Sequence, residues 1–126
     1  MVEELINGEM KLNQPAGHLE SGESLIEAVI RETREETAYQ FEPAYLVGIY
    51  RWQHPVNKDT YMRFCFNGNV TNHDPNQALD DDIHQAVWLT QEQIMRRQAD
   101  FRSPLVRDCL NDYLSGYRFP LTLLHN

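Results

Sequence analysis

The sequence is poor in the residues that would point to several common classes of protein. It has only two cysteines, Cys65 and Cys109, and without a CxxC pair they favour neither a zinc site nor a disulfide framework. No apolar run approaches the roughly 20 residues of a transmembrane helix. No internal repeat, low-complexity segment or signal peptide is visible. We therefore expect reduced thiols and a cytoplasmic location.

Basic residues are scarce as well. Lysine and arginine together number 11 against 19 acidic residues, which gives a formal net charge of −8. This balance disfavours nonspecific binding to a nucleic-acid backbone, which needs clustered Lys and Arg, and we expect no membrane partner either. An acidic protein also repels a phosphorylated substrate, so holding one would take a bound cation and local arginines. The histidines show no ligand spacing, and no Ser-His-acid arrangement accompanies Ser103.

The pattern of elements suits a single α/β domain covering residues 1–126, which is long enough to bury a core. Asn7-Gly8 predicts a hairpin between strands at 1–6 and 10–13, and Ser24 with Glu27 predicts a capped helix start. The other predicted elements are strands at 41–52 and 60–70, a short strand ending at 87–89, and helices at 91–98 and from 104 to 116. We expect Trp88 to lie in the core. This order predicts an α/β/α sandwich with a mixed β-sheet.

The long helix carries an acidic strip. Glu32, Glu35 and Glu36 stand at positions i, i+3 and i+4, so their carboxylates share one face. Like charges at this spacing repel, and a divalent cation would reverse that repulsion; Mg²⁺ prefers such oxygen ligands. The alternative is a solvated acidic face, softened by Arg31 and Arg34.

The stretch from Gly17 to Tyr39 resembles the Nudix box, G-x5-E-x7-R-E-U-x-E-E-x-G-U, where U is a bulky aliphatic residue. The chain keeps the first glycine and every charged position, namely Gly17, Glu23, Arg31, Glu32, Glu35 and Glu36. It departs from the pattern at Thr33, Ala38 and Tyr39, which lie on the packing side and at the helix end.

Three further segments are similar to the NudJ group of bacterial Nudix phosphatases. They are residues 12–20 (LNQPAGHLE), 102–106 (RSPLV) and 115–121 (SGYRFPL). The resemblance implies the Nudix fold and a phosphohydrolase activity on nucleoside di- and triphosphates and on phosphorylated thiamine-pathway pyrimidines. It also implies attack at the terminal phosphate.

The resemblance assigns roles to the residues of the box. It implies that Glu32, Glu35 and Glu36 ligate Mg²⁺ or Mn²⁺, with the backbone carbonyl of Gly17 as an extra ligand. Glu36 is the expected bridging ligand, and Glu32 is either a ligand or the general base. Arg31 is expected to pair with Glu23 and so to support the loop.

Residues outside the box are further candidates. Family members often place another carboxylate where Asp82 stands, which we favour over Asp80 and Asp81; the alternative is a solvated acidic loop. Arg51 and Arg63 are candidate phosphate contacts because arginine forks match phosphate geometry, although exposed arginines are common on sheets. Trp52 and Tyr61 are candidates for stacking on a substrate ring, with packing as the alternative.

Two other functions stay open at this stage. One is a Nudix enzyme for another substrate, such as ADP-ribose or a dinucleoside polyphosphate. The other is a Nudix-fold nucleotide sensor without catalysis. The intact Arg31, Glu32, Glu35 and Glu36 favour an enzyme over a sensor.

The start of the chain is short for this family, in which another strand, in a segment of about twenty residues in all, normally precedes the hairpin. We therefore expect an open strand edge near residues 2–6, because an unpaired edge recruits other strands. The apolar tail, residues 121–124, or a second subunit in a homodimer would cover that edge; the alternative is that further residues precede residue 1.

Overall fold

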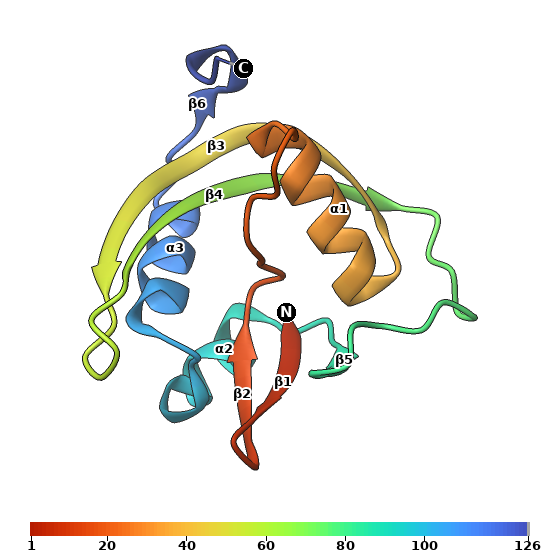
Figure 1. The fold of residues 1–126 in the computed structure, drawn as a ribbon, viewed down its shortest axis with the longest axis vertical. Helices are drawn as coiled ribbons and strands as arrows, with labels where there is room; N and C mark the ends of the chain where they lie inside the picture. Colours follow the sequence, from red (N-terminus) through yellow and green to blue (C-terminus); the bar gives the residue numbers. More distant parts are fainter. Residues whose placement is uncertain (126) are drawn as a thin grey trace.

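The computed structural model describes residues 1–125 as a mixed α/β fold (Figure 1). This confirms the predicted fold class. Its elements, in chain order, are β1 (Val2–Ile6), β2 (Glu9–Asn13), α1 (Leu25–Thr37), β3 (Gln40–Gln53), β4 (Thr60–Thr71), β5 (Ile83–Ala86), α2 (Gln91–Arg96), the 3₁₀ turn η1 (Gln98–Asp100), α3 (Pro104–Leu114), β6 (Phe119–Pro120) and the 3₁₀ turn η2 (Leu121–Leu123).

The strands form two three-stranded sheets, in the orders β2-β1-β5 and β4-β3-β6. All ladders within them are antiparallel. Within residues 1–125, parallel pairing is limited to an isolated bridge between Leu12 and Phe101. The long β3–β4 hairpin arches over the β1–β2 hairpin, and this arrangement brings the two sheets around one interior (Figure 1).

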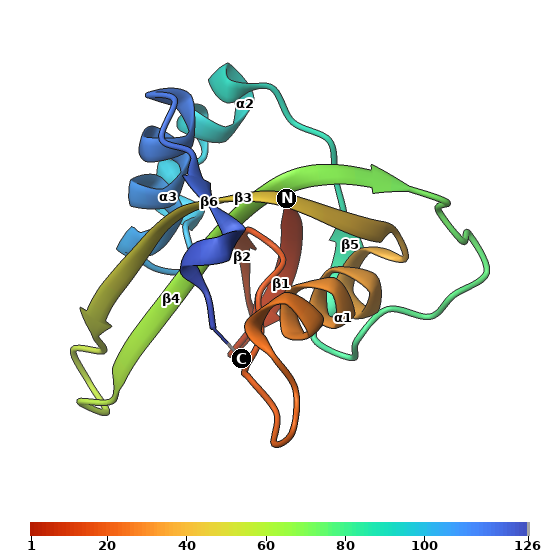
Figure 2. The same cartoon turned by 90° about the horizontal axis from the view of Figure 1, so that it is seen from above.

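The helices lie on opposite sides of the β3–β4 hairpin. α1 packs against β3 and β5, whereas α3 packs against β3 and β4. Both views show the two helices well separated (Figures 1 and 2). The most deeply buried side chains come from both sheets and from α3; they are Val2, Leu12, Leu46, Val47, Val106 and Cys109. Among the described residues, no helix is long and apolar enough to cross a membrane.

The helix α1 begins and ends where the sequence predicts. Ser24 accepts from the backbone N–H of Glu27, whose side chain accepts from the backbone of Ser24, which completes the capping box. The helix ends at Ala38, which has a φ of 60° where the Nudix pattern has glycine. A left-handed alanine costs roughly 1–2 kcal/mol relative to glycine, so the departure is tolerated locally. Thr33, another departure, is buried, and its hydroxyl donates to the carbonyl of Val29 at 2.7 Å.

The strand β1 is not an open edge. It lies between β2 and β5. Two more hydrogen bonds extend the pairing with the segment around β5, from the N–H of Leu5 to the carbonyl of Asp82 and from the N–H of Val87 to the carbonyl of Met1. The tail instead pairs with β3, where Phe119 and Pro120 face Leu46 and Tyr45. The expectation that the tail covers the edge at residues 2–6 is therefore wrong, because β5 already occupies that position.

Trp88 was expected in the core, and this expectation is also wrong. Its side chain is 76% exposed. The indole N–H donates to the hydroxyl of Tyr39 at 3.2 Å, and the two rings meet edge to face. The aromatic pair therefore packs at the surface, just beyond the C-terminal end of α1.

Candidate active site

Arg31 connects the glycine-containing loop to the acidic face of α1. Its guanidinium donates twice to the carboxylate of Glu23, from Nε at 3.0 Å and from Nη2 at 2.6 Å. Nη2 also donates to the carbonyl of His18 at 3.0 Å. Nη1 donates to Glu32 Oε1 at 2.7 Å and to Glu35 Oε2 at 3.1 Å. One side chain thus fixes the loop and two carboxylates of the strip at the same time.

The ion pair between Arg31 and Glu23 keeps its charges over the ordinary pH range. Hydrogen bonds from Arg31 are the main reason why the pKa of Glu23 falls to about 2, and the backbone N–H of Glu20 contributes further. The same contacts raise the pKa of Arg31. The Nudix resemblance predicts this pairing, and the structure shows it with both nitrogen–oxygen contacts formed, which is the strong bidentate geometry.

Three carboxylates converge beside Arg31. Glu32, Glu35 and Asp80 each offer an oxygen, and these oxygens lie within 4.8 Å of one another. The backbone N–H of Asp80 donates to the carbonyl of Glu35 at 3.1 Å, which fixes the segment before β5 against α1. Within the described residues this cluster contains neither Asp82, which the sequence favoured over Asp80, nor Glu36, the expected bridging ligand. Three consecutive aspartates carry no signal that tells which of them faces the helix.

Glu36 lies deeper than the other carboxylates. It is 6% exposed and accepts from the backbone N–H of Ala16 at 3.0 Å. Burial is the main cause that raises its pKa to about 8, and the negative charges of Glu4, Glu32 and Asp80 add to the effect, while the Ala16 hydrogen bond opposes it. Without a cation, Glu36 therefore holds its proton near neutral pH.

Glu32 depends on the glycine at position 17. A Cβ on Gly17 would lie 1.9 Å from the Glu32 Cδ and 2.1 Å from each of its carboxylate oxygens. Burial raises the pKa of Glu32, against the hydrogen bond from Arg31. Only a residue without a side chain lets the loop approach this carboxylate so closely.

The donor set fits a hard divalent cation. The candidate ligands supply only oxygen atoms; they are Glu32, Glu35, Glu36 and Asp80. Within residues 1–125, Arg31 is the one cationic side chain that hydrogen-bonds to any of them. Mg²⁺ and Mn²⁺ take oxygen ligands of this kind. A cation would also supply the positive charge that keeps Glu36 ionised.

One buried acid near this site escaped the sequence analysis. Glu4 on β1 is 5% exposed, accepts from Asn13 Nδ2 at 3.3 Å, and lies 3.3 Å from Arg102 Nε. Burial raises its pKa. A signal was present, because strand alternation places Glu4 on the same face as the fully buried Val2.

The candidate substrate residues of the hairpin divide between its two faces. In the β3–β4 register Trp52 faces Tyr61, with ring centroids 5.8 Å apart, and Arg63 lies on the same face. Arg63 donates to Gln14 Oε1 at 3.1 Å and to Asn13 Oδ1 at 3.4 Å, which directs it toward the loop after β2. Arg51 pairs with Met62 in the register and lies exposed on the opposite face.

Gly17→Ala is expected to disturb the acidic cluster more than the fold. The new Cβ would displace the flexible end of Glu32, so the melting temperature should change little. Mg²⁺ affinity should fall by roughly 10- to 100-fold, the usual range when the support of a ligand is lost. Calorimetric titration with Mg²⁺ measures this. Gly8→Ala is the matched control, because Gly8 has a φ of +80° with nothing within 4 Å of a new Cβ; it should lower stability and leave the affinity unchanged. Equal affinities in both variants would contradict the role given to the Gly17–Glu32 contact.

Glu36→Gln is expected to stabilise the metal-free protein at neutral and alkaline pH. The pKa of folded Glu36 is raised from 4.5 to about 8, so folding takes up a proton and stability falls as pH rises through this window. Glutamine keeps the shape and removes the charge. The gain should be on the order of a few kcal/mol at pH 8 and should vanish below pH 4.5. Urea unfolding with chelator across this range measures the difference, and a pH-independent difference would contradict it.

Comparison with known proteins agrees with this geometry. The NUDIX domain family model matches residues 6–109. Phosphatase NudJ from Escherichia coli (strain K12) is 40% identical over 124 residues, which cover 98% of this chain and 80% of the relative. Phosphatase NudJ from Shigella sonnei (strain Ss046) matches to the same extent. Among solved structures, a NUDIX hydrolase from Nitrosomonas europaea is 48% identical, with a TM-score of 0.97 over 99% of this chain and 85% of its own. The chain therefore belongs to the Nudix family and is a Nudix hydrolase similar to the NudJ phosphatases.

Proposed function

We propose that this Nudix hydrolase is a Mg²⁺-dependent phosphohydrolase that cleaves phosphoanhydride bonds of nucleoside di- and triphosphates. Pyrophosphates of the thiamine pathway form a second proposed substrate class. The observation that carries the proposal is the convergence of Glu32, Glu35 and Asp80 beside buried Glu36. Its relatives are phosphatases of the NudJ type, which supports release of phosphate.

The proposed cation ligands are the side chains of Glu32, Glu35, Glu36 and Asp80 and the backbone carbonyl of Gly17. Asp82, which lies two residues after Asp80, stays a predicted ligand. When bound, Mg²⁺ or Mn²⁺ neutralises charge on phosphoryl oxygens and lowers the pKa of a bound water. Arg31 holds Glu32 through Oε1, so the other carboxylate oxygen is the one left to act as ligand or to accept a proton as general base.

The hairpin supplies the proposed substrate contacts. Arg63 is hydrogen-bonded to two neutral amides, and it can exchange these acceptors for the charged oxygens of a phosphate, which form stronger hydrogen bonds. Trp52 and Tyr61 offer an aromatic surface for a substrate ring. Arg51 stays a predicted phosphate contact, although its exposed face of the hairpin is opposite to that of the other three.

Several broader expectations belong to the same proposal. We place the protein in the cytoplasm, where its two free cysteines would remain reduced, and we treat residues 1–126 as one Nudix domain. A homodimer is retained as a proposal from the sequence. A Nudix enzyme for a different substrate, such as ADP-ribose, is the main alternative, and a non-catalytic sensor is disfavoured by the complete acidic cluster.

Phosphate release from a panel of substrates tests the function. With Mg²⁺ the protein should release orthophosphate from nucleoside di- and triphosphates and from thiamine pyrophosphate, and chelator should abolish this activity. Glu36→Gln should lower turnover by roughly 100- to 1,000-fold, the usual loss when one group that stabilises charge in the transition state is removed. Glu42→Gln, an exposed change on β3, is the matched control and should keep full activity.

Three outcomes would count against this proposal. Cleavage of no phosphoanhydride at any Mg²⁺ concentration would favour the sensor. Release of pyrophosphate from triphosphates would contradict attack at the terminal phosphate. Full turnover by Glu36→Gln would remove Glu36 from the ligand set.

A further inference from the structure

We infer that a pocket between the tip of the β3–β4 hairpin and the start of α3 binds the ring end of the substrate and selects rings that carry carbonyl oxygens. This inference rests on the proposed function, because it takes the substrate to be a phosphorylated heteroaromatic compound. It assigns specificity to residues outside the acidic cluster, chiefly Phe101, Arg102 and Arg107.

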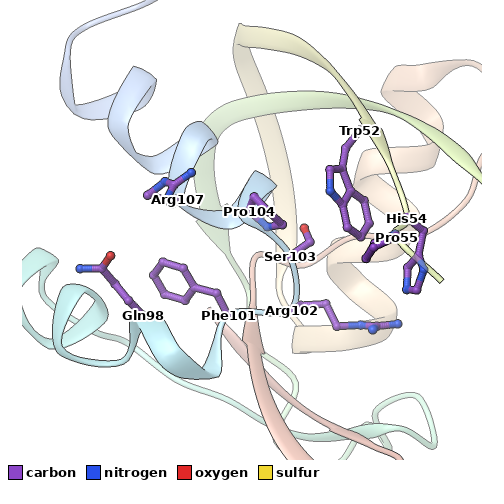
Figure 3. A pocket seen from close by; sticks show the side chains of 9 residues that line it. All are labelled: Trp52, His54, Pro55, Gln98, Phe101, Arg102, Ser103, Pro104 and Arg107. Carbon is purple, nitrogen blue, oxygen red and sulfur yellow. The ribbon is translucent and has the colours of Figure 1, made fainter. Parts of the chain in front are cut away.

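The pocket has the size and the walls for a ring. Its volume is about 430 Å³, within the range of small-molecule sites. Trp52, His54 and Pro55 line it from the hairpin, and Phe101 and Pro104 line it from the opposite side (Figure 3). Figure 3 shows the indole of Trp52 and the phenyl ring of Phe101 on the two sides of Ser103 and Pro104. Each of these two aromatic rings offers a surface on which a flat ring can stack.

A row of aromatic rings links this pocket to the acidic cluster. The ring of His18, next to Gly17 in the box loop, lies 6.4 Å from that of Tyr61. Tyr61 lies 5.8 Å from Trp52, and Trp52 lies 5.3 Å from His54, measured between ring centroids. The row begins one residue after Gly17, which approaches Glu32 closely, and it ends in the pocket. A substrate with phosphates at one end and a ring at the other can follow this path.

The charge of the pocket is opposite to that of the whole chain. Arg102 and Arg107 line it, and none of the described residues that line it is acidic, although the formal net charge of the protein is −8. Arg107 is about half exposed and contacts its neighbour Asp108 at 3.3 Å. Arg102 contacts Glu4 through Nε, so its terminal nitrogens remain for the pocket.

The polar side chains of the pocket are mostly hydrogen-bond donors. Arginine offers only donors. His54 Nδ1 accepts from the backbone N–H groups of Val56 and Asn57, at 3.1 and 3.3 Å, so the neutral ring carries its proton on Nε2 and donates there. The hydroxyl oxygen of Ser103 already accepts from the N–H of Leu105. Gln98 adds one amide with both functions. A ring rich in acceptors is therefore the better partner.

This donor set discriminates between rings. Guanine presents two adjacent acceptors that match an arginine fork, whereas adenine presents a donor at the corresponding position. Uracil and thymine also carry carbonyl oxygens. The aminopyrimidine ring of thiamine, like adenine, presents an amino donor and no carbonyl oxygen. We therefore expect guanine and uracil nucleotides to bind better than adenine nucleotides or thiamine pyrophosphate.

Fluorescence of Trp52 tests the site directly. The chain has two tryptophans, so Trp88→Phe leaves Trp52 as the sole reporter. In this background, with Mg²⁺ present, titration with guanosine monophosphate should quench the fluorescence to saturation, and adenosine monophosphate should bind about tenfold more weakly, as the loss of one good arginine–base contact implies. Neither probe contains a phosphoanhydride bond, so neither is consumed.

Arg107→Ala is the decisive variant, and Arg96→Ala is its matched control. Arg96 is exposed on α2 and pairs with Glu92, away from the pocket lining. Arg107→Ala should weaken binding of guanosine monophosphate about tenfold and raise KM for guanosine triphosphate, while kcat stays unchanged and the melting temperature stays close to that of the parent. Arg96→Ala should change none of these.

The outcomes separate this inference from the proposed function. Phosphate release with equal binding of the two monophosphates, or with no effect of Arg107→Ala, would overturn the pocket assignment and leave the phosphohydrolase intact. Saturable quenching that depends on Arg107, without hydrolysis of any nucleotide, would support the pocket and defeat the proposed function.

Discussion

The hydrogen bonds of Arg31 are the contact on which the site depends. One guanidinium binds the carboxylate of Glu23 in the loop through both Nε and Nη2, and its Nη1 holds Glu32 and Glu35 of the helix. Without that cation, the loop would lose its anchor and the strip would lose its compensating charge. The close approach of Gly17 to Glu32 then follows, because the loop is drawn against α1 and only glycine leaves room there. Loop, helix and cluster therefore form one unit.

Arg31 does not balance the charge of the site, and this imbalance explains much of the rest. Glu32, Glu35 and Asp80 converge beside a single guanidinium. Glu36, which is more deeply buried, keeps its proton near neutral pH because burial disfavours its ionised form. Glu4 adds a further buried acid, with Arg102 beside it. Arg102 also lines the pocket at the start of α3, so one side chain connects this buried acid to the donor-rich pocket.

Local sequence signals predicted the elements whose geometry is set by residues close together in the chain. The capping box at Ser24, the Asn7-Gly8 turn and the fixed spacing from Glu23 to Arg31 each specify a local geometry, and each is present in the structure. Asp80, the exposed position of Trp88 and the pairing of the tail with β3 depend on how distant segments pack. Their neighbours in the chain do not reveal that packing. Glu4 lies between these cases, because strand alternation placed it on the buried face beside Val2, but only the folded chain shows which groups surround it.

The central claim is that the acidic cluster binds a divalent cation and that binding ionises Glu36. Calorimetric titration of the metal-free protein with Mg²⁺ at pH 7, in two buffers of different ionisation enthalpy, measures both the affinity and the protons released. Because metal ligands must be deprotonated and the pKa of Glu36 is raised to about 8, the account predicts saturable binding with release of about one proton per protein. Absence of binding, or binding without proton release, would contradict it.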